Sequence, residues 1–214
     1  MRLVVLTNEQ LKEEFLSTGI NDSCKVDWIN SSKELSLHAD ADAIIDLLFE
    51  QNSYDISYLN DFAARLVFMN SINKSVAEIG LPIIRINAWP GFLKRSVAEV
   101  CCNNDVNKNE AEQILSLLNR KAEWVPDVKG FISARVVSMI INEAYFTLEE
   151  NVSTKEEIDI AMKLGTNYPY GPFEWSKKIG LKNIAALLTE LSLTEKRYQP
   201  ASLLLKEAKE QKWH

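Results

Sequence analysis

Residues 129–181 form the segment that most restricts how this chain can fold, because glycine, proline and polar residues divide it into helices of defined length. A long apolar run in this segment ends at Asn151. Ser153 and Glu156 then match a capping box, in which a hydroxyl at the helix start is followed three residues later by a carboxylate. Gly165 suits a left-handed residue at the end of that second helix. The segment therefore predicts a compact helical domain.

A rigid turn follows at Tyr168–Phe173, where two prolines and a glycine precede another helix that ends at Gly180. Taken together, these patterns resemble the C-terminal domain of the 3-hydroxyacyl-CoA dehydrogenases. That family shows the motifs PGF-xx-NR, NEA, DID-x-AM-x-LG and YP-x-GPF. The matching residues here are Gly130-Phe131-Ile132-Ser133-Ala134-Arg135, Asn142-Glu143-Ala144, Ile158-Asp159-Ile160-Ala161-Met162-Lys163-Leu164-Gly165 and Tyr168-Pro169-Tyr170-Gly171-Pro172-Phe173.

The first half of the chain alternates short apolar runs with amphipathic segments, which predicts a mostly parallel sheet with helices between its strands. Expected strands are Leu3–Leu6, Lys25–Ile29, Ala43–Phe49, Leu66–Met69 and Ile83–Ile86, and expected helices are Asn8–Phe15, Tyr58–Arg65 and Val76–Ile79. From Lys94 onward the signal is helical, with Asn107–Leu118 an amphipathic helix.

Val125-Pro126-Asp127 marks the expected domain boundary, since the residue before a proline disfavours helix. We therefore expect an α/β domain over residues 1–125 and an all-α domain over residues 126–214. The resemblance implies that the first is a reduced, degenerate Rossmann-like domain. It also implies that the second is a helical domain of the 6-phosphogluconate-dehydrogenase-like type.

Charge and composition exclude several classes of function. The chain has 214 residues and a formal net charge of −6, with a pI of about 5.1, which argues against a nucleic-acid partner. Its three cysteines lack the spacing of a metal site, and their odd number fits a reducing compartment. We find no signal-peptide pattern and no apolar run near the ~20 residues of a membrane span. The expectation is a cytoplasmic protein without a membrane or metal partner.

The resemblance implies an NAD-binding first domain, but the glycine turn that such a site requires is missing. The first strand continues directly into Thr7-Asn8-Glu9-Gln10-Leu11-Lys12, which contains no glycine. Glu9 also places negative charge where a helix start should receive a phosphate. Asp27, in the second strand, could replace the acidic residue that binds the ribose. We therefore expect no cofactor, and NAD follows from family resemblance alone.

The family's reaction uses a histidine base, a glutamate that orients it, and a serine and an asparagine that hold the substrate oxygen. The glutamate is retained as Glu99, for which we expect a helix. An alignment without gaps places Asn87 at the histidine, whereas a gap at the neighbouring proline places Ile86 there. Ile72 stands at the serine and Ala134 at the asparagine. An amide cannot accept a hydroxyl proton at neutral pH, so three of the four positions predict lost chemistry.

No other residue offers an evident replacement base. His38 falls in a predicted polar loop, and His214 is the last residue of the sequence. Ser71 neighbours the serine position but should point elsewhere. Lys94 and Arg95 could contact a CoA phosphate, although exposed basic residues more often only aid solubility.

Three hypotheses follow. The first is a catalytically impaired family member, a pseudoenzyme of fatty-acid metabolism, that keeps the fold and a symmetric homodimer and binds acyl-CoA or a partner enzyme. The second is an active oxidoreductase that uses Glu99 or the chain terminus as proton acceptor. The third is a non-catalytic regulatory or structural subunit that pairs with an active paralogue.

Overall fold

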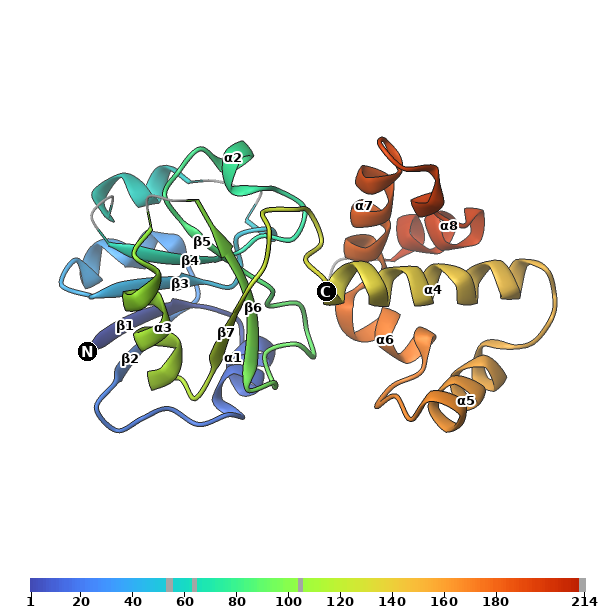
Figure 1. Ribbon diagram of the computed structural model, residues 1–214, viewed down its shortest axis with the longest axis horizontal. Coiled ribbons are helices and arrows are strands. Elements are labelled where there is room, and N and C mark those ends of the chain that lie inside the picture. The colour runs from blue at the N-terminus through green and yellow to red at the C-terminus, as the bar shows by residue number, and fades with distance from the viewer. Residues whose placement is uncertain (53–55, 63–64, 104–105, 212–214) are drawn as a thin grey trace. The chain divides into compact units, whose positions relative to one another are not determined.

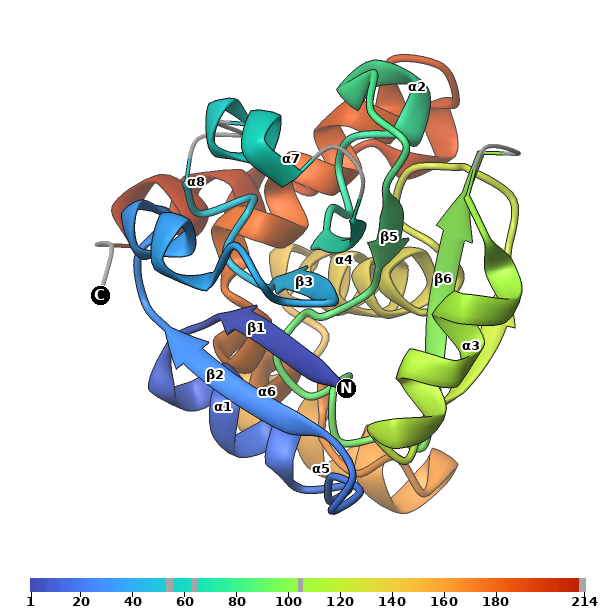
Figure 2. The ribbon, with the colours of Figure 1, turned by 90° about the vertical axis from the view of Figure 1, so that its left-hand side faces the viewer.

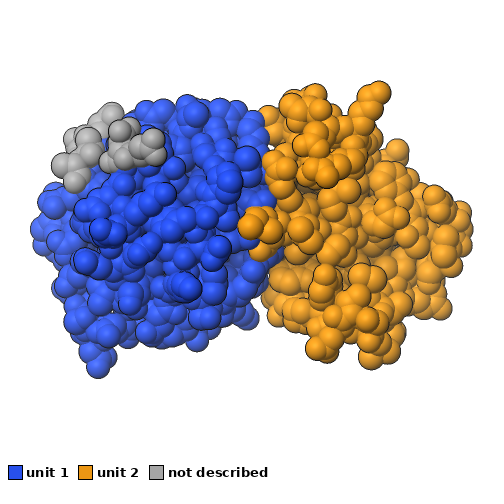
Figure 3. All heavy atoms as spheres, viewed as in Figure 1, with its two compact units in different colours: residues 1–131 blue, residues 132–214 orange. Residues whose placement is uncertain are grey.

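The computed structural model describes residues 1–52, 56–62, 65–103 and 106–211 and consists of two compact units, Met1–Phe131 and Ile132–His214 (Figure 3). The division lies a few residues after the expected one at 125/126. Pro126–Phe131 belongs to the first unit because Asp127 accepts the backbone N–H of Val76, and Gly130 donates its N–H to Ile72. Each unit is described by itself below.

The first unit is built on one seven-stranded sheet, with the strand order β2-β1-β3-β4-β5-β6-β7 (Figures 1 and 2). All neighbouring strands pair in parallel except β5 and β6, which are antiparallel. The mostly parallel sheet predicted from the sequence is confirmed. The strands are β1 (Arg2–Leu6), β2 (Lys25–Ile29), β3 (Ala43–Asp46), β4 (Leu66–Asn70), β5 (Ile84–Ile86), β6 (Val97–Cys102) and β7 (Lys121–Trp124).

Short helices connect these strands. α1 (Glu9–Leu16) is capped by Asn8, as predicted. α2 has the predicted bounds Val76–Ile79. α3 (Lys108–Leu117) contacts β7. Two 3-10 helices, η1 (Ser32–His38) and η2 (Ser57–Phe62), complete the connections. The helix expected over Tyr58–Arg65 is thus a shorter 3-10 turn, and residues 63–64 of that prediction lie outside the described residues.

The prediction that the chain is helical from Lys94 onward is wrong for β6 and β7. Side chains in β6 alternate between exposed and buried up to Val100, and those of β7 alternate as well. This two-residue period is the mark of a strand. Pairing with β5 gives β6 its partner, and this long-range interaction overrides the weak local helical preference.

The second unit is all-helical, as predicted. Its helices are α4 (Ser133–Glu149), α5 (Lys155–Thr166), α6 (Pro172–Ile179), α7 (Leu181–Ser192) and α8 (Ser202–Glu210), with a 3-10 turn η3 (Lys196–Tyr198) before α8 (Figure 1). The capping box lies one residue later than predicted, at Thr154 and Glu157, and α5 continues through Gly165 to a left-handed Asn167. Within the described residues, no helix combines the length and the apolar character needed to cross a membrane.

The turn before α6 contacts α5 where Gly171 lies against Asp159. The Asp159 carboxylate accepts the Phe173 N–H at 2.8 Å, which joins α5 to the start of α6. A Cβ on Gly171 would lie 2.3 Å from Asp159 Oδ1 and 2.5 Å from the Asp159 Cα. Because a backbone atom is among these neighbours, side-chain rotation cannot relieve the clash, and the position requires glycine.

Asp46 at the end of β3 is a fully buried carboxylate, and it ends the predicted Ala43–Phe49 strand early. Its side chain accepts the N–H of Leu48 at 2.8 Å and the hydroxyl of Tyr58, so the backbone turns away from the sheet at this point. Burial raises the pKa of Asp46 to about 6, although the hydrogen bonds from Tyr58, Leu48 and Phe49 act in the opposite direction.

We expect Gly171→Ala to lower the free energy of unfolding by about 1–3 kcal/mol, since the new methyl group overpacks the contact with Asp159. Gly165→Ala is the matched control, because a Cβ there meets no atom within 4 Å in the described part of the chain. That control should stabilise α5 by up to about 1 kcal/mol. Urea denaturation measures both changes, and equal effects of the two substitutions would contradict the steric argument.

The raised pKa of Asp46 predicts a pH dependence of stability. Native Asp46 keeps its proton up to a pH of about 6, whereas the unfolded chain loses it near about 3.9. The contribution of this proton to the free energy of unfolding is therefore present below about pH 4 and is lost as the pH rises through 6. Between pH 4 and 7 the wild type should lose about 3 kcal/mol relative to Asp46→Asn. Parallel pH curves for the two proteins would show that this carboxylate does not titrate as stated.

Candidate functional site

Open parallel sheets bind ligands outside the carboxyl ends of their strands, at the point where the strand order reverses. In this chain the order reverses between β1 and β3, because the chain passes from β1 to β2 on one side and then to β3 on the other. The candidate site is therefore the set of residues that follow β1, β3, β4 and β5.

Only Thr7 and Asn8 separate β1 from α1. The Asn8 side chain accepts the Leu11 N–H at 2.9 Å, and the Thr7 N–H donates to the Ile29 carbonyl at 2.9 Å. Glu9 adds an acidic side chain to the first helical turn. Protein groups thus satisfy donors at the place where a dinucleotide-binding turn would present free N–H groups to a pyrophosphate.

Asn87 and Glu99 lie together at the carboxyl end of β5. The Asn87 Nδ2 donates to Glu99 Oε2 at 2.8 Å, and the Asn87 N–H donates to the Glu99 carbonyl at 3.1 Å. Asn87 Oδ1 accepts the Trp89 N–H at 3.4 Å. Glu99 belongs to β6, so the expectation that it lies on a helix is wrong.

The two residues that the alignments place at the histidine position, Asn87 and Ile86, lie in different surroundings. Ile86 is a buried residue within β5 that pairs with Val100, whereas Asn87 is the residue whose side chain reaches Glu99. The Asn87 side chain uses both its amide N–H and its carbonyl oxygen within the protein and is 4% exposed. Asn87, and not Ile86, is therefore the residue whose side chain pairs with Glu99.

The position of the expected serine, Ile72, is fully buried after β4. Its N–H donates to Glu50 Oε1 at 2.8 Å, and its carbonyl accepts the Gly130 N–H at 2.8 Å. Ser71 does not replace it, because the Ser71 hydroxyl donates to the Lys74 carbonyl within its own turn. This edge of the sheet therefore offers no described hydroxyl at the serine position.

Sequence reasoning missed Glu50. Its carboxylate accepts the N–H groups of Ile72 and Asn73 at 2.8 and 2.7 Å, and burial raises its pKa despite these bonds. The sequence holds no local signal for this role, because the contact joins the ends of two different strands.

Arg85 was also missed, although a charged residue in the middle of the apolar run Ile83–Ile86 is a recognisable signal. Its fully buried guanidinium donates to Asp127 at 2.6 Å and to the carbonyls of Ser71 and Val128 at 2.8 and 3.2 Å. It also lies 4.7 Å from the ring centre of Phe131.

The first unit places Asp27 and His38 away from the carboxyl edge. Asp27 pairs with Val4 in mid-strand, and the Arg2 Nε donates to its carboxylate at 2.6 Å, so it does not stand where a ribose-binding acid would. His38 ends η1, not a loop, and its Nδ1 lies 3.4 Å from Asp27. His214 lies outside the described residues.

The remaining candidates divide between the two units. Lys94 is exposed, and the Arg95 guanidinium lies 4.3 Å from the ring centre of Phe92, where burial lowers its pKa. Ala134 is fully buried on α4 of the second unit, and Arg135 beside it donates to the Tyr198 hydroxyl at 3.2 Å. Among the described residues, no cluster of three histidine, cysteine or acidic side chains could hold a metal ion.

Comparisons with known proteins agree with these patterns. The family described as 3-hydroxyacyl-CoA dehydrogenase, C-terminal domain, matches residues 130–213. The 3-hydroxyadipyl-CoA dehydrogenase of Escherichia coli K12 is 30% identical over 176 residues, which cover 81% of this chain and 37% of that protein. A probable 3-hydroxybutyryl-CoA dehydrogenase of Bacillus subtilis is 38% identical over 94 residues, which cover 43% of this chain and 33% of that protein.

Among solved structures, the (S)-3-hydroxybutyryl-CoA dehydrogenase of Ralstonia eutropha superposes with a TM-score of 0.72 at 18% identity, covering 96% of this chain and 92% of that one. At this identity the likeness establishes the fold alone. The matches span about a third of the length of the curated relatives named above. The retained motifs, the fold and these matches show that the chain belongs to the 3-hydroxyacyl-CoA dehydrogenase family, is related to the 3-hydroxybutyryl-CoA dehydrogenases, and carries that family's C-terminal domain.

Proposed function

We propose that this family member does not catalyse dehydrogenation and instead binds an acyl-CoA, acting as a pseudoenzyme of fatty-acid metabolism. The observation that carries this proposal is the Asn87–Glu99 pair, in which an amide stands beside the carboxylate that would orient a histidine base. Oxidation of a 3-hydroxyacyl-CoA requires a group that removes the hydroxyl proton. An asparagine side chain has no basic site at neutral pH, so the pair can hold a group but cannot deprotonate it.

Two further features support the loss of turnover. The Asn8 side chain already accepts the Leu11 N–H in the first turn of α1, which leaves one donor fewer for a pyrophosphate to bind. Ile72 offers a buried alkyl side chain where a hydroxyl would stabilise the substrate oxygen. Acid–base catalysis alone contributes about 10²–10⁴-fold to a rate, and the lost oxygen contact adds to that deficit.

Binding of the acyl-CoA is supported by what the chain retains. The helical unit keeps the family's motifs, and Lys94 lies exposed beside Arg95 on the β5–β6 connection. Basic side chains are suitable partners for the phosphates of CoA. We propose no NAD cofactor and no nucleic-acid or membrane partner.

An assay of NADH oxidation with acetoacetyl-CoA tests this function. Wild-type protein should show no turnover above background, and Asn87→His should not restore it, because the glycine turn for the cofactor is still missing. In a thermal-shift experiment, acetyl-CoA or butyryl-CoA should raise the melting temperature by mass action. Turnover within about tenfold of an active relative would refute the impairment, and the absence of any shift with acyl-CoA would refute the binding role.

We also propose that the protein forms a two-fold symmetric homodimer through α5. Ile160 and Leu164 lie four residues apart, so they share one face of this helix, and they are 53% and 83% exposed. A second copy is the proposed occupant, because most homo-oligomers are closed and symmetric and because an isologous contact would bury this apolar face against itself.

Light scattering should give about twice the 24.3 kDa mass of the chain for the wild type and a monomer for Leu164→Glu. The matched control is Leu193→Glu, which changes an equally apolar residue, 73% exposed, after α7. This control should remain dimeric. A monomeric wild type, or a Leu164→Glu variant that stays dimeric, would contradict the proposed interface.

A further inference from the structure

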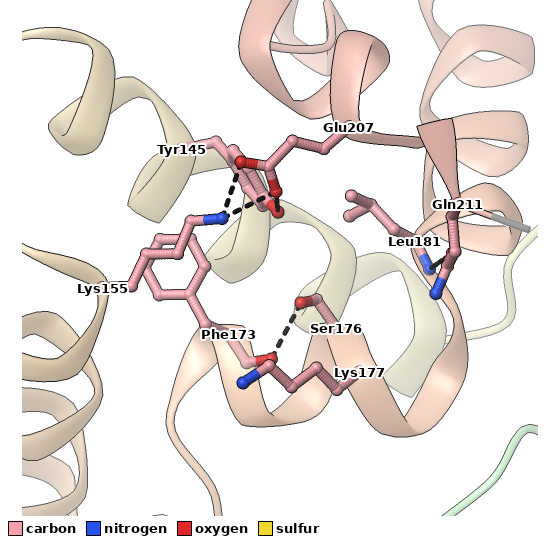
Figure 4. A pocket seen from close by; sticks show the side chains of 8 residues that line it. All are labelled: Tyr145, Lys155, Phe173, Ser176, Lys177, Leu181, Glu207 and Gln211. Carbon is pink, nitrogen blue, oxygen red and sulfur yellow. Dashed lines mark hydrogen bonds and ion pairs between the residues drawn. The ribbon is translucent and has the colours of Figure 1, made fainter. Parts of the chain in front are cut away.

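The second unit contains a cavity of about 170 Å³ to which α4, α5, α6, the start of α7 and α8 each contribute at least one side chain (Figure 4). Apolar cavities of about 150 Å³ hold a molecule the size of benzene. This cavity is therefore large enough for an organic ligand of about six non-hydrogen atoms. It lies wholly within residues 132–214 and includes neither the Asn87–Glu99 pair nor Lys94.

One wall of the cavity carries a carboxylate whose charge is already balanced. Glu207 accepts the Tyr145 hydroxyl at 2.7 Å and the Lys155 ammonium at 2.6 and 2.7 Å. Burial acts to raise the pKa of Glu207, but the bonds from Lys155 and Tyr145 outweigh it and lower the pKa. The Lys155 ammonium also lies 5.4 Å from the ring centres of Tyr145 and Phe173, so it interacts with both rings as well as with Glu207.

The opposite wall is positive and polar. Lys177 lines the cavity from α6, next to the buried Ser176, whose hydroxyl donates to the Phe173 carbonyl. Leu181, the first residue of the twelve-residue helix α7, lies at the cavity and donates its N–H to Gln211 Oε1 at 3.1 Å. A helix start carries partial positive charge. Lys177 thus brings a second lysine to the cavity beside the Lys155–Glu207 ion pair, and its charge also acts on the Glu174 carboxylate of the same helix.

Apolar surface accompanies this charge. The rings of Tyr145 and Phe173 pack edge to face with centres 5.1 Å apart, and the Leu181 side chain lines the same space. Figure 4 shows these rings on the side of Glu207 and Lys155, with Lys177 and Gln211 on the other sides of the opening. A ligand that fits both parts has one anionic head and a short apolar tail.

We propose that this cavity binds a short-chain carboxylate, with its carboxylate at Lys177 and its alkyl part against Phe173, Tyr145 and Leu181. Free inorganic phosphate shares the anionic chemistry but lacks the tail, and it should bind less well. The site is a ligand site of the helical unit, separate from any acyl-CoA bound elsewhere on the chain.

Calorimetric titration of the full chain with butyrate tests the proposal. Butyrate should bind saturably with a dissociation constant on the order of 1 mM, as expected for so small a ligand. Lys177→Gln should weaken it by up to about fivefold, the usual range for a partly exposed charge pair. Lys178→Gln is the matched control on the same helix, since its ammonium lies over the Tyr170 ring, and it should leave the affinity unchanged. Butyramide, which has the same shape without the charge, should not bind.

Three results would overturn the proposal. They are the absence of saturable butyrate binding, an equal loss in Lys177→Gln and Lys178→Gln, and phosphate binding at least as tight as butyrate. The last two would indicate general attraction of anions to the surface. Because Lys177→Gln should not alter a thermal shift by acyl-CoA, failure of this site and failure of the proposed function are distinguishable.

Discussion

The buried ion pair between Arg85 and Asp127 is the interaction on which the candidate site's framework depends. Arg85 is fully buried in β5, an interior strand of the sheet, and its guanidinium reaches the carbonyls of Ser71 and Ile72 after β4. Asp127 in turn accepts the N–H of Val76 at the start of α2. Removing one partner of such a pair costs about 3–5 kcal/mol, because the other charge is left buried and uncompensated. One guanidinium thereby fixes the ends of two strands and the segment that leaves the first unit.

Under the proposed function, this edge of the sheet keeps its framework without the reacting group. Several polar groups that follow the strands pair with one another: Asn87 binds Glu99 and the Trp89 N–H, while Glu50 binds the loop after β4. Buried polar groups that lack partners are costly, so a substitution at the base position is tolerated when the new side chain can still pair. Asn87 meets that requirement through its amide, which keeps the contact with Glu99 but provides no proton acceptor.

Much of this architecture could be read from the sequence, because strong local patterns define it. The turn and helix motifs of residues 129–181 and the bounds of β2 and α2 followed from apolar period, glycine and proline. β6 could not be recognised in this way, since its alternation covers only Val97–Val100 and its position in the sheet comes from pairing with β5. The sequence predicts the capping box one residue early because Ser153 and Thr154 both carry a hydroxyl group. Only the backbone geometry shows that Thr154 is the capping residue. The contacts of Arg85 join segments far apart in the chain, so no local pattern contains them.

The central proposal is that the first unit holds no dinucleotide, because the turn after β1 lacks glycine and the Asn8 side chain occupies the Leu11 N–H. Calorimetric titration of the purified chain with NADH tests this most directly. The account predicts no saturable binding at about 1 mM cofactor, which would also leave the melting temperature unchanged. Saturable binding with a dissociation constant in the micromolar range, lost when Asn8 is replaced by a bulky side chain, would contradict it.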